Sequence, residues 1–379
     1  MALKQVILHV GLHKTATTSF QITCANNRKQ LKGQGIHYPQ FEIDRRKINN
    51  HSVPIFSLFC DRPERYNINI KWGYSQQVDR INAAYQKQLD TAIDTHTRIL
   101  LSGEDISALP PGGLEAFKRY LIDRGCDVRV LCGVRRPYSS TCSGIQQKVR
   151  GGILGDFQHS TVPQKCRQIK MLKNTFDNIE FFSFEADCRH PAGPIGALLG
   201  RVGVDYSRIK QTEKNEGLGN ISTRLYADIN KIFPVLLDGK LNPLGRDVSV
   251  TDFDETRFLL TPQELSTMKD AIDKENREYC RLLGEEFTDS TYPTSDPFFF
   301  DLEMASKILK TASRPSHVRE AVEDFLCRHS DNSWNKSDLV KISLPRLDKT
   351  GIARFLRLHQ YSLVARVANL IFATIQRNR

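Results

Sequence analysis

The first half of the chain alternates short apolar runs with longer amphipathic segments. Each apolar run is bounded by polar residues or glycine, a pattern typical of strands buried on both faces of a parallel sheet. These runs are residues 5–10, 98–102, 128–133 and 179–184, and segments with helical spacing lie between them at 78–95, 113–124 and 163–176. Strands that alternate with helices predict βαβ units and a sheet covered by helices on both faces.

After residue 184 the pattern becomes mainly helical, with helices predicted at residues 194–200, 221–233 and 261–283. The segment 289–297 is rich in turn-forming residues and is the expected domain boundary. We therefore predict an α/β domain over residues 1–290 and a helical extension over residues 298–379. From Lys349 onward the chain carries five arginines and no acidic residue. A helix there is expected to pack on its own domain, and peripheral membrane contact is the alternative.

Composition and charge add limits to this picture. The net charge of +11 and the pI near 9.2 suit an anionic ligand, although a basic solvated surface would give the same balance. No window is apolar enough for a transmembrane helix, and the apolar start is too short for a signal peptide. Nine scattered cysteines without a CxxC pair predict reduced thiols, a cytoplasmic location and no zinc site.

Residues 11–19, which we call the anion loop, follow the first predicted strand and lead into a helix expected to begin near Thr17. Backbone N–H groups in such a loop form an anion site together with the positive end of the helix dipole. Lys14 adds a mobile positive charge, and the hydroxyl groups can donate to phosphate oxygens. The residues expected to bind the ligand here are Gly11, His13, Lys14, Thr15, Ala16, Thr17, Thr18 and Ser19.

A P-loop kinase or ATPase is an alternative that the spacing does not favour. The nucleoside-triphosphatase loop places its lysine directly after a second glycine, six residues after the first. Here Lys14 follows Gly11 by three residues, and no glycine precedes it. The sequence also offers no obvious acidic partner for magnesium at a strand end.

A second candidate site follows the third predicted strand. Arg135 stands at the end of that strand, Pro137 suits the start of a helix, and Ser143 lies eight residues after Arg135. An arginine and a serine so placed could converge on one phosphate group, for which the guanidinium fork is well shaped.

The anion loop resembles the 5′-phosphosulfate-binding loop of sulfotransferases that use 3′-phosphoadenosine 5′-phosphosulfate (PAPS), above all bacterial members with a His-Lys-Thr-x-Thr-Thr-Ser sequence. Arg135, Pro137 and Ser143 match the family's Arg-x-Pro-x5-Ser pattern, which binds the 3′-phosphate of PAPS. The resemblance covers roughly residues 5–235 and is specific at the two loops. The adenine-side loop of the animal cytosolic enzymes has no late counterpart in this chain.

This resemblance implies a P-loop-like three-layer α/β sandwich and transfer of a sulfuryl group from PAPS, as co-substrate, to an acceptor hydroxyl by in-line displacement. Lys14 would stabilise the leaving phosphate. No metal is expected, because Lys14 and backbone amides can balance that charge. The acceptor is expected to be a glycan or glycolipid, with a small molecule as the alternative, and no nucleic-acid partner is expected.

The acceptor hydroxyl must lose a proton, so a base is needed near the anion loop. Glu104 is the first candidate because it closes a predicted central strand, although a carboxylate there could equally cap a helix. His51 is the second candidate, with a polar loop histidine as the plain alternative. His9 alternates into the first strand and is expected to be structural. A binding module for nucleotide or glycan that has lost catalysis is the competing class of function.

Overall fold

The structure is a computed structural model that describes residues 4–212, 217–237, 239–243, 245, 251–254, 256–312 and 318–343. By contact the chain divides into two units. The first contains residues up to Ser140, Val162–Glu216 and Ala271–Ser290, and the second contains Thr141–Thr161, Gly217–Asp270 and the chain from Thr291 onward. The last segment of the first unit ends at Ser290, where the sequence predicted a boundary. That residues 1–290 form one domain and residues 298–379 an extension stays a prediction. The basic segment from Lys349 lies outside the described residues.

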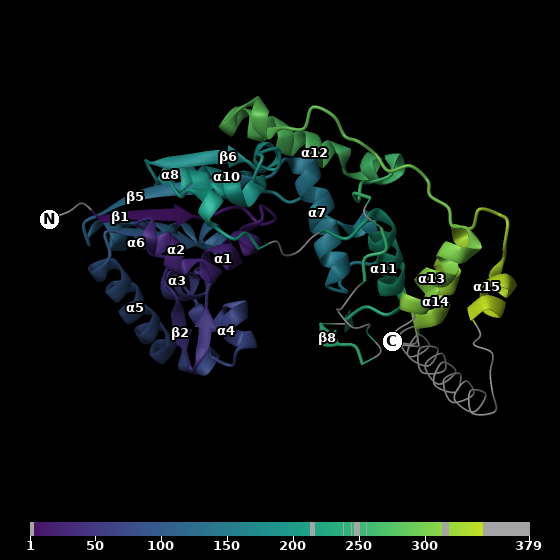
Figure 1. Cartoon of the computed structure of the whole chain (residues 1–379), viewed down its shortest axis with the longest axis horizontal. Helices are drawn as coiled ribbons and strands as arrows, with labels where there is room; N and C mark the ends of the chain where they lie inside the picture. Colours follow the sequence, from purple (N-terminus) through teal and green to yellow (C-terminus); the bar gives the residue numbers. More distant parts are fainter. Residues whose placement is uncertain are drawn as a thin grey trace. The chain divides into compact units, whose positions relative to one another are not determined.

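A four-stranded parallel sheet forms the centre of the first unit, and Figure 1 shows three of its strands as neighbouring arrows. The strands are β1 (Lys4–His9), β4 (Arg98–Ser102), β5 (Cys126–Val134) and β6 (Ile179–Ser183), in the order β4-β1-β5-β6. His9, the last residue of β1, lies beside Ser102 of β4 and Leu131 of β5. All four strands were predicted from their apolar runs, and their carboxyl ends share one edge of the sheet.

Alternate residues of each strand enter different cores, which makes the unit a three-layer sandwich. Val6 and Leu8 of β1 belong to one apolar cluster, whereas Ile7 between them belongs to another. The first cluster contains residues of α3 (Ser52–Phe59), α5 (Val78–Thr95), α6 (Pro111–Ile122) and α8 (Cys166–Thr175). The second contains residues of α1 (Thr17–Asn26), α2 (Arg28–Gly33) and α10 (Gly193–Arg201). The predicted parallel sheet flanked by helices is therefore confirmed.

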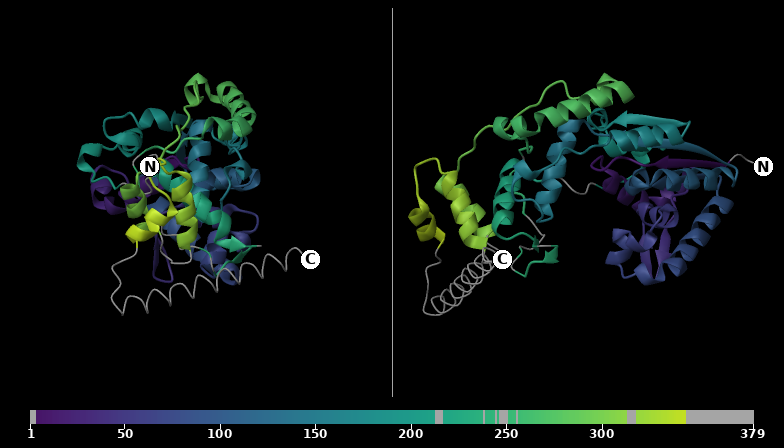
Figure 2. Two further views of the ribbon diagram at one scale, coloured as in Figure 1. Left: turned by 90° about the vertical axis from the view of Figure 1, so that its right-hand side faces the viewer. Right: turned by 180° about the vertical axis from the view of Figure 1, so that it is seen from behind.

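The predicted helices follow their sequence patterns closely, and α5 has the predicted bounds. The helix from Pro137 is α7 (Pro137–Arg150), and the later ones are α11 (Asn220–Ile232) and α12 (Pro262–Leu283). Elements without a clear period were missed. They are α3, α2, the short α4 (Asn67–Lys71) and the small hairpins β2 (Phe41–Ile43) with β3 (Arg46–Ile48) and β7 (Leu236–Leu237) with β8 (Lys240–Leu241). The blue helix α5 and the small β2–β3 hairpin can be followed in the turned views of Figure 2.

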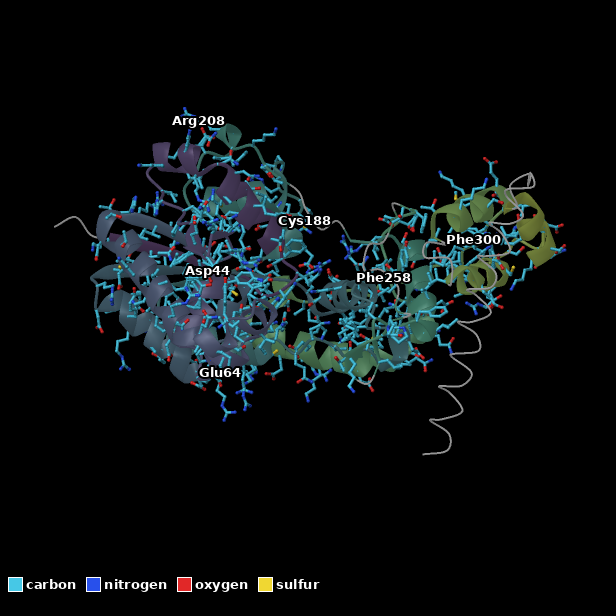
Figure 3. The ribbon with its side chains drawn as sticks, turned by 90° about the horizontal axis from the view of Figure 1, so that it is seen from below. Asp44, Glu64, Cys188, Arg208, Phe258 and Phe300 are labelled. Atoms are coloured by element: carbon cyan, nitrogen blue, oxygen red, sulfur yellow. The ribbon has the colours of Figure 1, made fainter. Side chains whose placement is uncertain are left out.

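The second unit is mainly helical, as the sequence predicted. It includes α11 and the helices α13 (Leu302–Ala312), α14 (Arg319–Arg328) and α15 (Lys336–Ser343). Phe300, labelled in Figure 3, is buried beside Phe325, and its carbonyl accepts a hydrogen bond of 2.8 Å from Trp334 Nε1. Among the residues described, no helix is long and apolar enough to span a bilayer.

Candidate anion-binding site

The anion loop is anchored on the neighbouring strand β5. The Leu12 N–H donates to the Gly133 carbonyl over 3.0 Å, which prolongs the contact of β1 with β5 beyond the last strand residue. Gly11 follows Val10 at a position where neighbouring side chains leave little room for a Cβ atom. A Cβ atom on Gly11 would lie 2.9 Å from both His9 Nε2 and Thr15 Oγ1, closer than real Cβ atoms come. A larger residue at the start of the loop would therefore force one of these side chains to shift.

Two residues of the loop adopt left-handed backbone conformations. Lys14 has a φ of 76° and Ala16 a φ of 59°, and α1 begins directly after Ala16. Serine, threonine, aspartate or asparagine usually caps such a helix start, but the alanine side chain has no acceptor. The first turn of α1 also contains no acidic residue. Ala16 therefore supplies no side-chain cap to the amides of this helix start, the kind of position where anions bind in proteins.

The hydroxyl groups of the loop divide into inner and outer sets. Thr15 is buried and donates from Oγ1 to the Leu12 carbonyl over 2.7 Å, so it closes the loop internally. Thr17 is also buried, with its Oγ1 3.4 Å from Thr15 Oγ1. Ser19 is buried in the first turn of α1, whereas Lys14 and Thr18 are partly exposed. Lys14 and Thr18, together with His13, are thus the polar loop side chains that are partly open to solvent.

Arg135 joins the second predicted site to the anion loop. Its Nη1 donates to the Lys14 carbonyl over 3.1 Å, and its Nε donates to Ser139 Oγ over 2.8 Å. The close approach of β5 depends on Gly133, where a Cβ would lie only 3.2 Å from Thr15 Cβ. The structure therefore brings Arg135 and Lys14 together, although 121 residues separate them in the sequence. Ser139, which orients the guanidinium, was missed because it lies inside the x5 segment of the pattern.

Ser143 is buried in α7 and belongs to the second unit. Its convergence with Arg135 on one phosphate stays a prediction.

Glu104 lies at the margin of the anion loop, directly after β4. It opens a short 3₁₀ turn, Glu104–Ala108, and its Oε1 is 3.6 Å from His13 Nδ1. The other ring nitrogen of His13 is 3.4 Å from Asp105 Oδ1, so the imidazole bridges the two carboxylates. Burial acts to raise the pKa of Glu104, but the hydrogen bond and charge of His13, with His9 and Lys14, outweigh it and lower that pKa. Glu104 is therefore ionised at neutral pH.

His51 is placed differently from the expectation. It is fully buried, its Nδ1 accepts from the Ser102 N–H over 2.9 Å, and its Nε2 lies 2.8 Å from the Pro39 carbonyl. Both ring nitrogens are therefore occupied, and burial lowers the pKa of His51 to about 3. The imidazole ties β4 to the segment before β2 and offers no lone pair for a substrate proton. This geometry favours the structural alternative over the role of base.

Carboxylates of the chain itself bind backbone amides at the start of α7, the helix that follows Arg135. At α7 the Tyr138 N–H donates to Asp289 Oδ2 over 2.7 Å, and the Arg136 N–H donates to the Glu185 carboxylate over 3.3 Å. Burial, with the charge of Glu185, raises the pKa of Asp289 to about 6 although the Tyr138 N–H opposes this. Asp289 is distant in the sequence, so no local pattern could have pointed to it.

The start of α11 is occupied in the same way. The carboxylate of Asp254 accepts from the N–H groups of Asn220 and Ile221 over 3.0 and 2.9 Å, and the Gly219 N–H donates to Asp252. These internal carboxylates distinguish α7 and α11 from α1, whose start has an alanine instead.

Two hollows in the described part of the chain lie outside the anion loop. One, of about 330 Å³, follows β6 and is lined by Arg136, Arg189 and Arg201 together with Glu180 and Glu286. Arg201 is already paired with Glu180 and Asp187.

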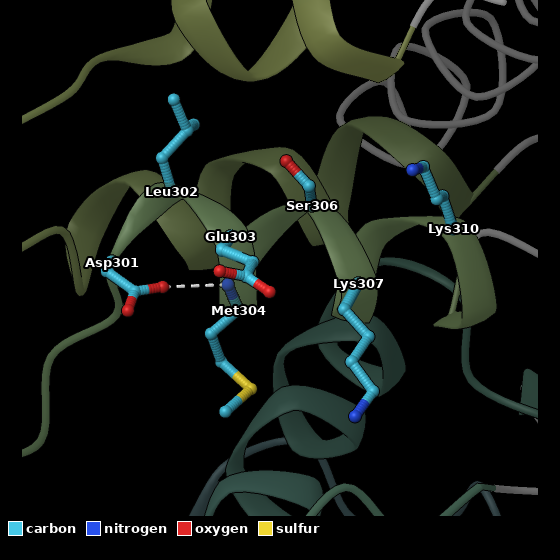
Figure 4. Close-up of a pocket in the computed structure, with 7 residues that line it drawn as sticks. All are labelled: Asp301, Leu302, Glu303, Met304, Ser306, Lys307 and Lys310. Carbon is cyan, nitrogen blue, oxygen red and sulfur yellow. Dashed lines mark hydrogen bonds between the residues drawn. The ribbon is translucent and has the colours of Figure 1, made fainter.

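The other hollow, of about 710 Å³, lies along α13. In Figure 4 Met304 and Lys307 point to one side of that helix, and Leu302 and Ser306 point to another. Its lining, drawn from a single helix, suggests no chemistry. No group of three His, Cys, Asp or Glu side chains suited to a metal ion occurs within the residues that the structure describes.

Comparison with known proteins gives a similarity to solved structures. No protein-family model matches the chain, and no curated protein matches it. Among solved structures the chain is similar to a sulfotransferase from Alicyclobacillus acidocaldarius. The two are 15% identical, with a TM-score of 0.41, and the alignment covers 74% of this chain and 96% of that chain.

Proposed function

We propose that the chain is a sulfotransferase that moves a sulfuryl group from PAPS to an acceptor hydroxyl. The observation that carries this proposal is the hydrogen bond from Arg135 Nη1 to the Lys14 carbonyl. It supports the proposal because Lys14 and Arg135, the two residues that we expect to bind phosphate groups, lie on adjoining loops of neighbouring strands. A nucleotide with phosphate groups at both its 3′ and 5′ positions needs two such groups close together, whereas a simple phosphate needs only one.

The loop residues suit the charge changes of sulfuryl transfer. In the reaction the acceptor oxygen forms a bond to sulfur while the bond from sulfur to the bridging phosphate oxygen breaks. The leaving adenosine 3′,5′-bisphosphate gains negative charge, which the Lys14 ammonium and the positive end of the α1 dipole would stabilise. Arg135, held by Ser139, and Ser143 would hold the 3′-phosphate.

Glu104 is our candidate for the base that takes the acceptor proton. It is ionised, it lies beside His13 of the anion loop, and it follows the strand next to β1. His51 has no ring nitrogen left for this task. A base in this position would typically contribute about 100- to 10,000-fold to the rate. The basic net charge of the chain supports an acidic acceptor such as a glycan or glycolipid.

The experiment that tests the proposal follows labelled sulfate from PAPS into a panel of glycan and small hydroxyl acceptors. Lys14→Ala should lower transfer by about 100- to 1,000-fold, because one fixed charge at the leaving group is lost. Lys47→Ala, at an exposed lysine of β3, should leave transfer unchanged. Full activity of Lys14→Ala would overturn the mechanism.

A thermal-shift measurement separates the competing functions. We expect adenosine 3′,5′-bisphosphate to raise the melting temperature by an amount that grows with its concentration, and Mg-ATP to have a smaller effect. A larger effect of Mg-ATP would favour the kinase. Binding of the bisphosphate without transfer to any acceptor would favour a binding module.

A further inference from the structure

His9 has a position that its expected structural role does not explain. It ends β1 and is fully buried, with its ring edge-on to Phe20 at 5.1 Å between centroids. Its Nδ1 lies 2.9 Å from Ser102 Oγ on the neighbouring strand. One side of the imidazole is therefore tied to β4. If burial among apolar residues were the only requirement at this position, phenylalanine would meet it equally well.

The other ring nitrogen, Nε2, has no hydrogen-bond partner among the described residues. A buried polar atom without a partner costs about 1–3 kcal/mol, so an orphan of this kind calls for an explanation. Its position supplies one. Nε2 lies 2.9 Å from the point where a Gly11 Cβ would be, and Thr15 Oγ1 and Thr17 Oγ1 lie 2.9 and 3.3 Å from the same point. Nε2 thus faces the inner side of the anion loop.

The protonation state of His9 makes Nε2 a suitable donor. Burial lowers the pKa of His9 to about 4, although the charge of Glu104 opposes this, so the ring is neutral at pH 7. When Ser102 donates its hydroxyl hydrogen to Nδ1, the ring hydrogen lies on Nε2. This N–H can donate to a threonine oxygen, and that threonine can then donate its own hydrogen outward. Hydrogen bonds in such a chain strengthen one another.

We propose that His9 is a positioning residue of the anion loop, which acts through Thr17. When a phosphorylated nucleotide occupies the loop, the His9 Nε2–H donates to Thr17 Oγ1, and the Thr17 hydroxyl donates to an oxygen of the 5′-phosphate. The orphan nitrogen gains its partner only in the bound state, so nucleotide binding carries the free energy of that hydrogen bond. This inference rests on the proposed function, since it assumes that the nucleotide occupies the anion loop.

The direct test is ¹⁵N NMR of the full chain with labelled histidine, during titration with adenosine 3′,5′-bisphosphate. We expect the His9 Nε2 resonance to move in proportion to nucleotide bound. His51 is the matched control, because it is equally buried and contacts the same Ser102 but has both ring nitrogens occupied. Its resonances should stay in place.

Variants then separate positioning from packing. His9→Phe should weaken bisphosphate binding about tenfold, and His9→Gln, which places an amide near the Nε2 position, should recover most of that loss. Thr17→Val should weaken binding in the wild-type chain and have little further effect in His9→Phe, because the two residues act in one hydrogen-bonded chain.

The outcomes distinguish this inference from the proposed function. Failure of the wild-type chain to bind the bisphosphate would overturn both. If the wild type binds it but the His9 resonance does not move, the inference on His9 is overturned and the proposed function stands. Independent, additive effects of His9→Phe and Thr17→Val would also overturn it. If His9→Phe does not fold, the NMR measurement on the wild type decides.

Discussion

The anion loop obtains its shape from residues in unfavourable backbone conformations. Lys14 and Ala16 both have positive φ angles, which cost an L-amino acid roughly 1–2 kcal/mol each. The hydrogen bonds from Leu12 to Gly133 and from Arg135 to Lys14 hold the loop in this form. The sequence pattern revealed the loop, but it could not show which of its residues are strained.

Ala16→Gly should remove one source of this strain. Glycine adopts a positive φ freely but loses more conformational freedom on folding, so we expect a net gain of about 0.5–1 kcal/mol in the free energy of unfolding. Ala83, an exposed residue inside α5, is the matched control, and Ala83→Gly should lower that free energy by about 1 kcal/mol. Urea unfolding followed by circular dichroism measures both. A loss of stability in Ala16→Gly would contradict this account of the loop.

The charge and position of Glu104 lead to a prediction about its role in transfer. Glu104→Gln keeps the shape of the side chain but removes its ability to take a proton. We expect transfer to fall by about 100- to 10,000-fold while the affinity for adenosine 3′,5′-bisphosphate stays within a few-fold. Steady-state rates and calorimetric binding measure the two effects separately. An equal loss in binding and rate would assign Glu104 to the nucleotide site instead of to the acceptor.

At the scale of elements, the strands and long helices follow from the sequence because their apolar periods are strong. The four strands are short apolar runs, and α5 shows a clear amphipathic period over 18 residues. The missed elements have weaker signals, since α4 has only five residues and α3 is apolar on most sides. The carboxylates that bind the first amides of α7 and α11 come from distant segments. Asp289 at α7 and Asp254 at α11 lie 151 and 34 residues from their partners, Tyr138 and Asn220.

Gly103 controls how closely β4 approaches α3. A Cβ on Gly103 would lie 2.3 Å from the Ser52 backbone nitrogen, and a backbone atom cannot move aside as a flexible side chain can. Gly103→Ala should therefore separate these elements, cost about 1–3 kcal/mol and displace Glu104, which follows directly. Thermal unfolding and transfer activity should both decline.

Gly112 in α6 provides the control for this substitution. An added Cβ there meets no atom within 4 Å, so Gly112→Ala should leave the chain unchanged or more stable by up to about 1 kcal/mol. Equal losses in Gly103→Ala and Gly112→Ala would show that the close approach of β4 to α3 is not the cause.

On the scale of the whole molecule, buried histidines dominate the response to acid. Burial lowers the pKa of His9 and His37 to about 4 and that of His51 to about 3, below the ordinary value of 6.5. Between pH 4 and 6.5 these histidines therefore bind protons in the unfolded chain but not in the native chain. The free energy of unfolding falls as the pH falls. Asp289 has the opposite effect between pH 4 and 6, because its raised pKa lets the native state bind the proton first. Burial also raises the pKa of Asp187, which acts in the same direction as Asp289, and burial also lowers the pKa of His329. The four histidines outweigh the two carboxyl groups.

We therefore expect the free energy of unfolding to decrease steadily as the pH falls from 6.5 to 4. Urea titrations at half-unit steps of pH measure this. Asp289→Asn removes a carboxyl group that opposes the effect of the histidines. The free energy of unfolding of this variant should therefore fall more steeply over the same pH interval. A wild-type stability that rose on acidification would contradict the assignment of neutral, buried histidines.

The discontinuous course of the chain also bears on how the protein is made. Strand β6 ends at Ser183, yet the first unit is completed only by residues 271–290, which supply Tyr279 and Phe287 to the core beside β1. During translation, part of one apolar face of the sheet would stay uncovered until residue 290 has left the ribosome. A nascent chain in this state is a natural client for chaperones that shield apolar surface. Stop codons placed before residue 271 should therefore give products that proteases degrade readily.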